Sequence, residues 1–401
     1  MQTDWDLIIV GGGAAGLFLR ASLSGKKRVL LLEAGPRAGR KLLVTGGGMC
    51  NLTNTLAADE FLGHFGSKQQ RNFLLPAIQT FPPEDTRTWF SSQGLVTVAR
   101  ADGKVFPASM QSSDVLTTLL RANSSPIHYQ ESVVAVHKKD THFIITTTKG
   151  SYTSRRLALA TGGMSVPQTG SDGSGYRLAE ALGHTITALH PALVGITIAN
   201  HQLAGLSGIT IDAQRITLTR SGSTAPYAVS HGEVLITHRG LSGPPILTLS
   251  GDMQAGDRIV LTLIADAHQR FKEASGKQGV RTLLTESGLT RSLADTLLAQ
   301  AGIDGHRPMS QIKRVDRNRL ASLVSSFSME VSGTGGFATA MVTRGGIPLS
   351  EVDRKSMQSR RCAGLYFAGE ILDYDGESGG YNLQGAFSTA HLAAQSLEKE
   401  L

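Results

Sequence analysis

A glycine-rich turn between an apolar run and a helical segment constrains the fold of this chain more than any other feature. Leu7 to Val10 is apolar and partly β-branched, which is typical of a buried parallel strand, and the pattern from Ala14 to Leu23 predicts a helix. Between them, Gly11 permits a tight turn, Gly13 lets the backbone approach a pyrophosphate, and Gly16 lets the helix pack closely on the strand. The sequence therefore predicts a turn that binds a dinucleotide.

The residues after this turn complete a βαβ unit. Val29 to Leu32 is typical of a second buried strand, and it ends at an acid about 20 positions beyond the turn, where a ligand for ribose hydroxyls is expected. The first N–H groups of the helix lie at its positive end and suit a phosphate. The contacts expected in this unit are Gly11, Gly13, Ala14, Ala15, Gly16, Glu33 and Ala34.

A second segment with the character of a cofactor site stands near the other end of the chain. Leu365 to Ala368 has the pattern of a buried strand, and it delivers a glycine and an acid suited to hydrogen bonds with a ribityl chain. A later glycine pair leads to the last helix, predicted from Gly385 to Leu397, whose N-terminal side would face the flavin edge that becomes negative on reduction. An ordinary NAD site needs neither feature, so the predicted cofactor is FAD. The contacts expected here are Gly369, Glu370, Gly379, Gly380, Tyr381, Asn382 and Leu383.

The middle of the chain has a different character from its ends. From about Pro191, short alternating segments separated by polar turns predict an antiparallel sheet or small barrel, and Phe271 to Gln300 has helical periodicity. Before this region we expect a helix at Asp114–Arg121, a strand pair at His128–His137 and Phe143–Thr148, and a strand at Leu157–Ala160. Within it we expect strands at Ile196–Ile198, Ile209–Ile211, Ile216–Thr219, Glu233–Thr237 and Arg258–Ile264.

The expected fold class is therefore α/β, with a discontinuous Rossmann-type FAD-binding domain interrupted by an inserted domain. The FAD-binding domain is assigned to residues 1–190 and 335–401. The insert, residues 191–334, is expected to be β-barrel-like and to carry a small helical piece at about 268–311. A cleft between two such domains is a favoured place for a ligand.

Composition narrows the class of protein. The formal net charge is +7, but Lys and Arg are scattered, which favours anionic cofactors and substrates and disfavours nucleic acid as a partner. No apolar run reaches the length of a membrane helix. The two cysteines, Cys50 and Cys362, form no CxxC pair, and no cluster has the spacing of metal ligands. We expect a cytoplasmic protein without a membrane segment or a metal.

Several blocks of sequence carry a family likeness. The segment from Gly39 to Asn54, GRKLLVTGGGMCNLTN, is too glycine-rich for regular structure and too patterned for a linker. With Ala160–Gly163, Thr237–Pro244, Thr343–Ile347 and Gly369–Gln384, it resembles the BaiN-like flavoproteins, a family that includes enzymes of the aminoacetone oxidase type. The resemblance covers essentially the whole chain. It implies an FAD-dependent oxidoreductase fold with an inserted barrel and helical piece, and NAD(P)H as one candidate reductant.

The same resemblance implies further cofactor contacts. Residues of the glycine-rich block and of the loop after Ala160 would line the pyrophosphate and flavin, and Val134 would touch the adenine end through its backbone. The implied contacts are Arg40, Lys41, Thr45, Gly46, Gly47, Gly48, Asn51, Val134, Thr161 and Gly162. The alternative for Arg40 and Lys41 is a solvated basic pair. The chain departs from the family at Met49, where an arginine is common, and this removes a charge near the cofactor.

Candidate catalytic residues come from the insert and the segment after it. His231, His238 and Arg239 are expected in or beside loops of the insert, and Arg344 on the loop that follows it. The catalytic assignment is His238, Arg239 and Arg344: a histidine that polarises the substrate or transfers a proton, and arginines that hold an anion. The alternative for each histidine is a hydrogen-bonded structural role. For Cys50, packing is favoured over redox chemistry because no resolving cysteine is nearby in sequence.

The sequence therefore predicts an FAD-dependent oxidoreductase that acts on a small-molecule substrate by hydride transfer at flavin N5. No separate NAD(P)H-binding domain is visible in the sequence, so a nicotinamide would enter the same cleft as the substrate. Two alternatives stay open: a flavin-dependent RNA-modifying protein, in keeping with the basic charge, and a flavin-binding protein without turnover.

Overall fold

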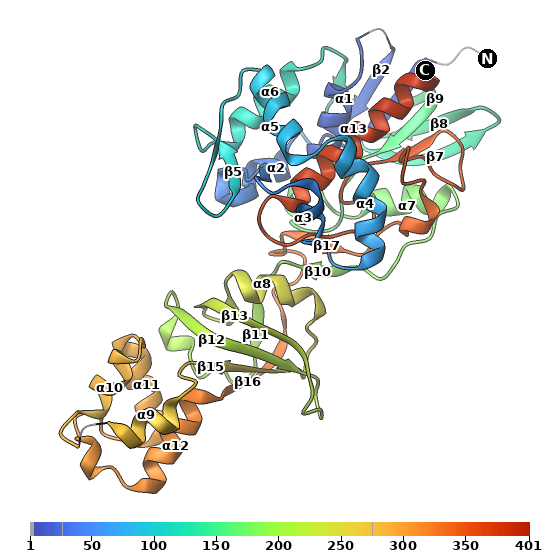
Figure 1. Ribbon diagram of the computed structural model, residues 1–401. Coiled ribbons are helices and arrows are strands. Elements are labelled where there is room, and N and C mark those ends of the chain that lie inside the picture. Colours follow the sequence, from blue (N-terminus) through green and yellow to red (C-terminus); the bar gives the residue numbers. More distant parts are fainter. Residues whose placement is uncertain (1–3, 26, 275) are drawn as a thin grey trace. The chain divides into compact units, whose positions relative to one another are not determined.

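The computed structural model describes residues 4–25, 27–274 and 276–401. Its internal contacts divide the chain into two units, residues 1–192 with 337–401 and residues 193–336. Each unit has its own hydrophobic core. Both ends of the chain, blue and red in Figure 1, belong to the first unit, whereas the middle, coloured from light green to orange, forms the second.

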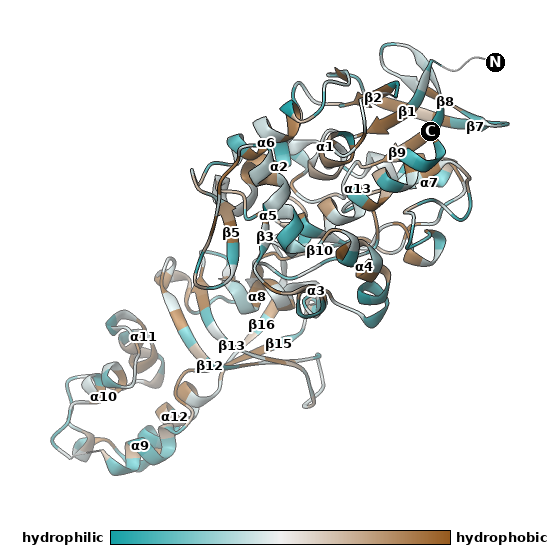
Figure 2. Cartoon of the chain, turned by 45° about the horizontal axis from the view of Figure 1, so that its top comes forward, coloured by the Kyte–Doolittle hydropathy of each residue, from teal (hydrophilic) through white to brown (hydrophobic). Residues whose placement is uncertain are grey.

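A seven-stranded sheet is the frame of the first unit. Parallel pairing joins β6 to β2, β2 to β1, β1 to β9 and β9 to β18, and antiparallel pairing adds β8 and β7. The central strands are apolar and buried because helices cover both faces of a parallel sheet; Figure 2 shows β1 and β2 in brown. The strands are β1 (Trp5–Val10), β2 (Val29–Leu32), β6 (Ile127–His128), β7 (Val133–Lys139), β8 (His142–Thr147), β9 (Ser151–Leu159) and β18 (Leu365–Phe367).

Helices and two small sheets surround this frame. The helices are α1 (Ala14–Ala21), α2 (Arg40–Val44), α3 (Ala58–Leu62), α4 (Lys68–Thr80), α5 (Pro83–Ser92), α6 (Ser112–Arg121), α7 (Ser174–Ala181) and α13 (Tyr381–Glu400), with the short 3₁₀ turns η1 (Thr45–Gly48), η2 (Pro167–Thr169) and η6 (Leu349–Glu351). The small sheets are β3 (Thr53–Asn54) with β5 (Lys104–Pro107) and β4 (Thr97–Ala99), and β10 (His190–Ala192) with β17 (Val342–Arg344).

Aromatic packing fastens the last helix to the first. Phe18 of α1 is fully buried, and its ring lies 4.9 Å from the ring of Phe387 in α13 and 5.1 Å from that of Phe81. Such ring pairs add about 0.5–1.5 kcal/mol each beyond the burial of apolar area. These contacts hold the two ends of the chain in one domain although the insert separates them in sequence.

The second unit is a closed antiparallel barrel with helices attached. The strand order is β11-β14-β13-β12-β15-β16, and β16 closes on β11. The barrel strands are β11 (Ile196–Ile198), β12 (Thr210–Thr219), β13 (Pro226–Ile236), β14 (Gly240–Ser242), β15 (Arg258–Thr262) and β16 (Phe327–Thr334). The helices are α8 (Pro244–Leu249), α9 (Ala267–Glu273), α10 (Val280–Glu286), α11 (Arg291–Ala301) and α12 (Arg314–Ser325), with 3₁₀ turns at η3 (Ala204–Leu206), η4 (Ser250–Asp252) and η5 (Met309–Gln311). The predicted α/β fold with a barrel-like insert and a helical piece is confirmed.

Several predicted element boundaries are wrong. The segment 128–137 is not one strand, because β6 ends at His128 and the chain turns there to bind the end of β2: the N–H of Glu131 donates to the carbonyl of Glu33. The two strands expected at 209–211 and 216–219 form the single strand β12, which continues through an irregularity between Ala213 and Ile216.

Other elements were missed or misplaced. The block from Gly39 to Asn54 is not irregular throughout, since it contains α2, η1 and β3. The last helix begins at Tyr381 rather than Gly385, and the helical piece of the insert continues through α12 to Ser325. The short strands β10, β14 and β17 and the eight-residue β16 carry too little local pattern to be separated from loops by sequence.

Candidate functional site

The register of the parallel strands brings four chain segments to one edge of the sheet. Val10, the last residue of β1, is paired with Leu32 on one side and Leu159 on the other, and Leu159 is paired with Phe367. The chain therefore leaves β1, β2, β9 and β18 at the same edge, their carboxyl ends. Ligands of open α/β sheets bind outside this edge.

Gly11, Gly13 and Gly16 of the first glycine-rich segment differ in their surroundings. A Cβ on Gly11, whose φ is +103°, would lie 2.6 Å from the carbonyl oxygen of Ala160, and one on Gly16 would lie 1.9 Å from the carbonyl oxygen of Gly11. Both positions are closed to any side chain by neighbouring backbone. A Cβ on Gly13 would meet no atom within 4 Å. Gly11 and Gly16 thus serve the packing of α1 on the sheet, whereas Gly13 leaves an open cradle at the start of the helix.

The N-terminus of α1 faces this cradle with its hydrogen-bonding groups uncommitted. Gly13 is the N-cap residue and supplies no side-chain cap. Among the described residues, no acceptor binds the N–H groups of Ala14, Ala15 or Gly16. Unsatisfied amides and the positive end of a helix dipole form an anion site suited to a pyrophosphate.

Glu33 stands where the ribose ligand is expected, at the end of β2. Its Oε2 accepts a hydrogen bond from the N–H of Gly12 at 2.7 Å, and its Oε1 accepts one from the N–H of Gly35 at 2.6 Å. These bonds fix the carboxylate beside the glycine turn. Val134 is the extra residue of a bulge, since the register of β7 on β8 shifts between Val133 and Ala135. Within the described strands, Val134 is therefore paired with no residue of β8.

The turn before α13 is held in shape by two asparagines. The side chain of Asn382 accepts from the N–H of Gly376 at 2.9 Å and donates to the carbonyl of Gly376 at 2.7 Å. The amide of Asn51 accepts from the N–H of Gly380 at 3.0 Å and donates to the carbonyl of Thr53 at 2.9 Å. Gly380 has φ of +94°, and a Cβ there would lie 2.4 Å from the carbonyl oxygen of Thr53. Both amide side chains therefore hold the backbone of the turn before α13 in place.

The same turn opens α13 without a side-chain cap. Among the described residues, the N–H groups of Tyr381, Asn382 and Leu383 have no acceptor. A second helix N-terminus with free donors thus belongs to the first unit, and α13 packs along α1. The flank of Gly379 is filled by the Tyr381 ring, since a Cβ there would lie 2.7 Å from its Cε2.

Glu370 is the centre of a polar network that sequence reasoning did not foresee. Its Oε2 lies 2.6 Å from the Nζ of Lys41, and its Oε1 accepts from the Oγ of Ser165 at 2.9 Å and from the N–H of Thr343 at 2.7 Å. The ammonium of Lys41 also donates to Ser165. Lys41 is therefore not the solvated side chain of the alternative interpretation. Arg40 donates to the carbonyl of Gln168.

The glycine-rich block leaves room for a ligand. Gly46, Gly47 and Gly48 have φ of +56°, +66° and +90°, and a Cβ on Gly47 would meet nothing within 4 Å. Thr45 donates its hydroxyl to the carbonyl of Leu42 at 2.6 Å. At Met49, where the family commonly has an arginine, a guanidinium nitrogen of the exposed Arg100 lies 3.5 Å from the sulfur.

Two buried hydroxyls in the segment between β9 and α7 have no hydrogen-bond partner among the described residues. They belong to Thr161 and Ser171. A Cβ on Gly162, between them in the site, would lie 3.2 Å from the Ser171 hydroxyl. Buried hydroxyls without protein partners are uncommon in folded proteins, and an ordered water or a ligand usually satisfies them.

Both cysteines are free and buried. Burial raises the pKa of the Cys50 thiol to about 12, so it is protonated at neutral pH. The preference for packing over redox chemistry at Cys50 agrees with this environment. No group of three or more His, Cys, Asp or Glu residues in the described ranges is placed to hold a metal ion, and no helix in them has the length and apolar character to cross a membrane.

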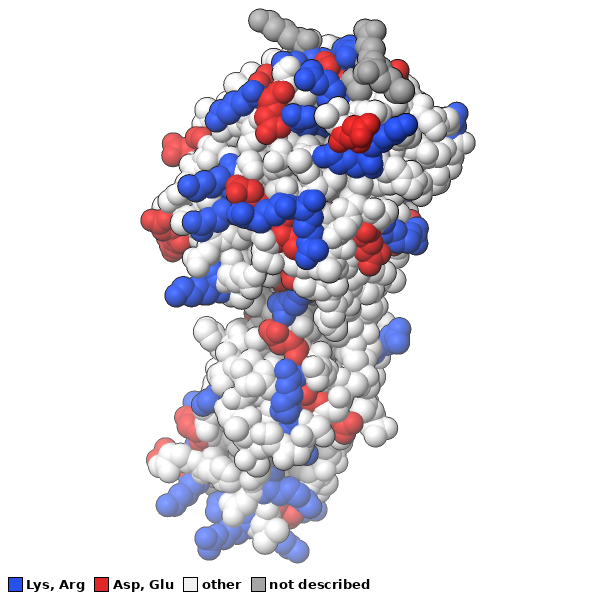
Figure 3. Space-filling model, turned by 90° about the vertical axis from the view of Figure 1, so that its right-hand side faces the viewer, with Lys and Arg blue, Asp and Glu red and all other residues white. Residues whose placement is uncertain are grey.

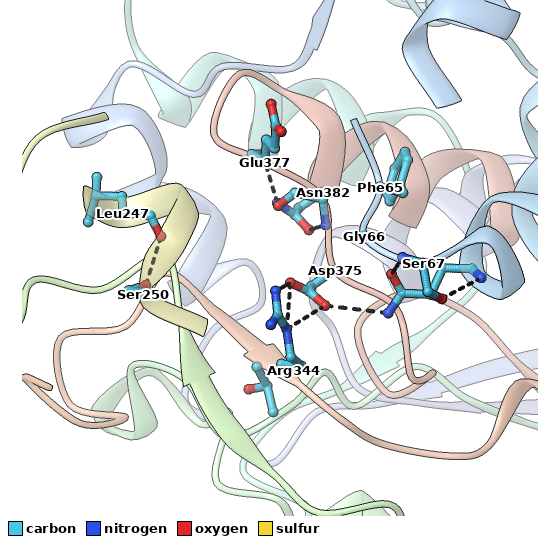
Figure 4. A network of polar contacts seen from close by, with 12 residues as sticks. Phe65, Gly66, Ser67, Leu247, Ser250, Arg344, Asp375, Glu377 and Asn382 are labelled. Carbon is cyan, nitrogen blue, oxygen red and sulfur yellow. Dashed lines mark hydrogen bonds and ion pairs between the residues drawn. The ribbon is translucent and has the colours of Figure 1, made fainter. Parts of the chain in front are cut away.

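The candidate catalytic residues lie in two units. Arg344 was expected on a loop, but it is the last residue of β17. The pairing of β17 with β10 fixes its backbone. Its Nη2 lies 3.0 Å from the buried carboxylate of Asp375, and its Nε contacts the same group (Figure 4). His238 and Arg239 are exposed in the turn between β13 and β14, and His231 lies within β13 rather than a loop.

Together these features fit FAD. The open cradle at Gly13, the two uncapped helix starts, the carboxylate of Glu33 and the unpartnered hydroxyls of Thr161 and Ser171 are the donors and acceptors that a dinucleotide with a flavin requires. Ser165, Thr343 and Asp375 are the polar residues that the sequence prediction missed. Thr343 and Asp375 lie within two of the quoted family blocks and Ser165 just beyond a third, but no pattern in the sequence singled them out.

Comparison with known proteins identifies the family. The model of the HI0933-like protein Rossmann domain matches residues 5–396. The chain is 31% identical to a ribosomal RNA dihydrouridine synthase of Escherichia coli, covering 98% of each chain. It is 31% identical to a 3-dehydro-bile acid delta(4,6)-reductase of Clostridium scindens, covering 97% of this chain and 98% of the relative.

The fold also recurs in solved structures. A 3-ketosteroid delta1-dehydrogenase of Sterolibacterium denitrificans superposes with a TM-score of 0.54 at 13% identity, covering 99% of this chain and 100% of that one. The cradle, the two helix starts and the family match agree with one another. The chain belongs to the HI0933-like family and is an FAD-dependent oxidoreductase.

Proposed function

We propose that this protein reduces a carbon–carbon double bond conjugated to a carbonyl group. The observation that carries this proposal is the pair of full-length relatives, one named for making dihydrouridine in ribosomal RNA and one for reducing a 3-dehydro-bile acid at positions 4 and 6. In uracil and in an unsaturated ketone alike, the carbonyl withdraws electrons, so the far carbon of the double bond accepts a hydride.

FAD, when bound and reduced, supplies the hydride from N5. The residues of this chain would hold it in place: the amides of Ala14, Ala15 and Gly16 would bind the pyrophosphate, and Glu33 a ribose. The N-terminal amides of α13 would stabilise negative charge on the reduced flavin. The remaining contacts would come from Arg40, Lys41, Thr45, Gly46–Gly48, Asn51, Thr161 and Gly162, with Val134 at the adenine.

Two classes of substrate follow from the two relatives. The first is a small unsaturated ketone, and the second is a uracil base within RNA. His238, Arg239 and Arg344 are the proposed substrate contacts, with a histidine as proton donor to the second carbon of the double bond. For Arg344, the ion pair with Asp375 positions the guanidinium (Figure 4). NADH or NADPH is the proposed reductant.

An anaerobic two-step experiment tests this function. The FAD-loaded protein is first reduced with NADH or NADPH while flavin absorbance is followed. It is then mixed with a small cyclic enone, a 3-oxo steroid with conjugated double bonds, a uridine-rich RNA, or air. Reoxidation by an enone or by RNA, with two hydrogens gained by that substrate, supports the proposal. Reduction of the flavin by a small amine, with reoxidation only by oxygen, would instead make the protein an oxidase.

A further inference from the structure

An open groove lined by hydroxyl and guanidinium side chains runs along the outside of the barrel in the second unit. Its volume is about 420 Å³. Its floor comes from alternate residues of two neighbouring strands: Arg215, Thr217 and Thr219 of β12, and Arg258, Val260 and Thr262 of β15. Serine and threonine side chains from the turn after β12 and from the end of α12 form its rims. No Asp, Glu or aromatic side chain lines it.

The irregularity in β12 creates this floor. Ile211 and Ala213 point into the barrel, and so do Ile216 and Leu218 beyond the shift in register. Gln214 and Arg215, between the two pairs, are both exposed. An extra residue of this kind re-aims the side chains that follow it. As a result Arg215 shares the outer face with the threonines at 217 and 219.

The two arginines of the groove are uncommitted. Among the described residues, neither Arg215 nor Arg258 has an ion pair or a side-chain hydrogen bond, although Glu330 is the cross-strand neighbour of Arg258 on β16. The neighbouring Arg220 differs from both, because its guanidinium forms an ion pair with the buried carboxylate of Asp257 at 2.7 Å. Guanidinium groups beside hydroxyls, in a groove whose own lining holds no carboxylate, are a chemical match for phosphate oxygens.

The spacing of the two arginines suits an extended anion. Arg215 is paired with Thr262, and Arg258 with Thr219, so the arginines stand at opposite ends of the paired segment. At about 3.3 Å per residue and 4.8 Å between strands, their Cα atoms are about 14 Å apart. A stacked nucleic-acid strand carries one phosphate per about 3.4 Å of axis, so this distance spans about four nucleotides. The two guanidinium groups can therefore each contact a separate phosphate of one extended strand.

We propose that this groove binds the backbone of a single-stranded RNA segment. This assignment rests on the proposed function and narrows its substrate to uracil within RNA. The lining contacts phosphates and sugars but offers no aromatic ring for stacking, so it positions a strand without reading its bases. The threonine hydroxyls donate to phosphates and pair with 2′-hydroxyl groups, which favours RNA over DNA.

Binding is measured with the full-length, FAD-loaded protein and a fluorescently labelled, uridine-rich RNA of about ten nucleotides, by anisotropy at several salt concentrations. Arg215→Gln and Arg258→Gln are each expected to weaken binding up to about fivefold. Each is also expected to lower the slope of log K against log salt by about 0.7, the value for one phosphate contact of a single strand. The matched control is Arg291→Gln on α11, which removes the same charge from an exposed site outside the groove and should leave affinity and slope unchanged.

Three results would overturn the groove assignment. They are wild-type affinity in both groove variants, an equal loss in Arg291→Gln, and equal affinity for DNA of the same sequence. Circular dichroism of each variant establishes that it is folded. The proposed function fails separately: RNA retained in the groove while reduced flavin is not reoxidised by RNA or enone contradicts the reductase, not the groove. Reoxidation by enone without RNA retention contradicts the groove alone.

Discussion

Replacing Gly13 by alanine separates cofactor binding from folding. The backbone at Gly13 has φ of −80° and ψ of −170°, a conformation open to any residue, and the added Cβ would meet no atom within 4 Å. Alanine makes the unfolded chain less flexible, which stabilises the folded protein by about 0.4–1 kcal/mol. Alanine is also a poorer N-cap residue than glycine, and this effect lowers the stability. The free energy of unfolding of the apoprotein should therefore change by less than about 1 kcal/mol.

The effect on FAD should be large. The methyl group would occupy the space through which the pyrophosphate approaches the amides of Ala14 and Ala15. Loss of two charge-assisted hydrogen bonds at about 1.5–3 kcal/mol each weakens binding by about 100-fold or more. Flavin fluorescence titration of the apoprotein measures this affinity, and urea unfolding measures stability.

Gly16→Ala is the matched comparison. Its Cβ would lie 1.9 Å from the carbonyl oxygen of Gly11, so this variant should lose stability before any effect on FAD can be read. Wild-type FAD affinity in folded Gly13→Ala would show that the pyrophosphate does not bind at the start of α1. Equal stability losses in the two variants would refute the open cradle.

Three further outcomes follow from the polar groups of the first unit. Burial lowers the pKa of His184, and although burial alone raises that of Glu351, hydrogen bonds from Thr185 and His184 hold it below its ordinary value. Both depressed pKa values mean that the unfolded chain binds more protons. The contribution of His184 is present above about pH 6.5 and is lost as pH falls, so urea midpoints should drop from pH 7.5 to 5.5, and less so in His184→Gln. The contribution of Glu351 is lost only below about pH 4.5. Since burial raises the pKa of Cys50 to about 12, a disulfide reagent at pH 8 should label it only after unfolding; rapid labelling of the native protein would contradict its burial. Glu370→Gln should cost about 1 kcal/mol through the lost ion pair with Lys41, as the urea midpoint reports, and a double-mutant cycle with Lys41→Met should give a coupling energy above zero.

The sequence was informative where structure is local. Strands β1, β2 and β18 and the glycine turn were predictable because a buried parallel strand and a phosphate-binding turn each need particular residues at fixed spacing. The start of α13 at Tyr381 was not, because Gly380 and the two residues after it have no helical periodicity of their own. Their conformation depends on Asn51 and Thr53, more than 300 residues away in sequence.

Non-local partners also explain the remaining errors. The break between β6 and β7 depends on hydrogen bonds to Glu33 and Gly35 at the end of β2. The continuity of β12 depends on its neighbours β13 and β15, since no local pattern distinguishes an irregular strand from two strands and a turn. The network around Glu370 joins it to residues from three other segments of the chain. Hydrogen-bond partners of this kind leave no periodic trace in the chain.

The candidate FAD site is built mainly from backbone. This explains why the cofactor could be predicted from the sequence and the substrate could not. Glycines and helix starts supply the proposed contacts, while Glu33, Asn51 and Asn382 hold that backbone in place. Such a frame depends on the cofactor rather than on the substrate. It is therefore compatible with relatives named for ribosomal RNA and for a bile acid at equal identity to this chain. Discrimination between those substrates has to come from side chains outside the frame, and the uncommitted arginines of the barrel groove are the place to look for it.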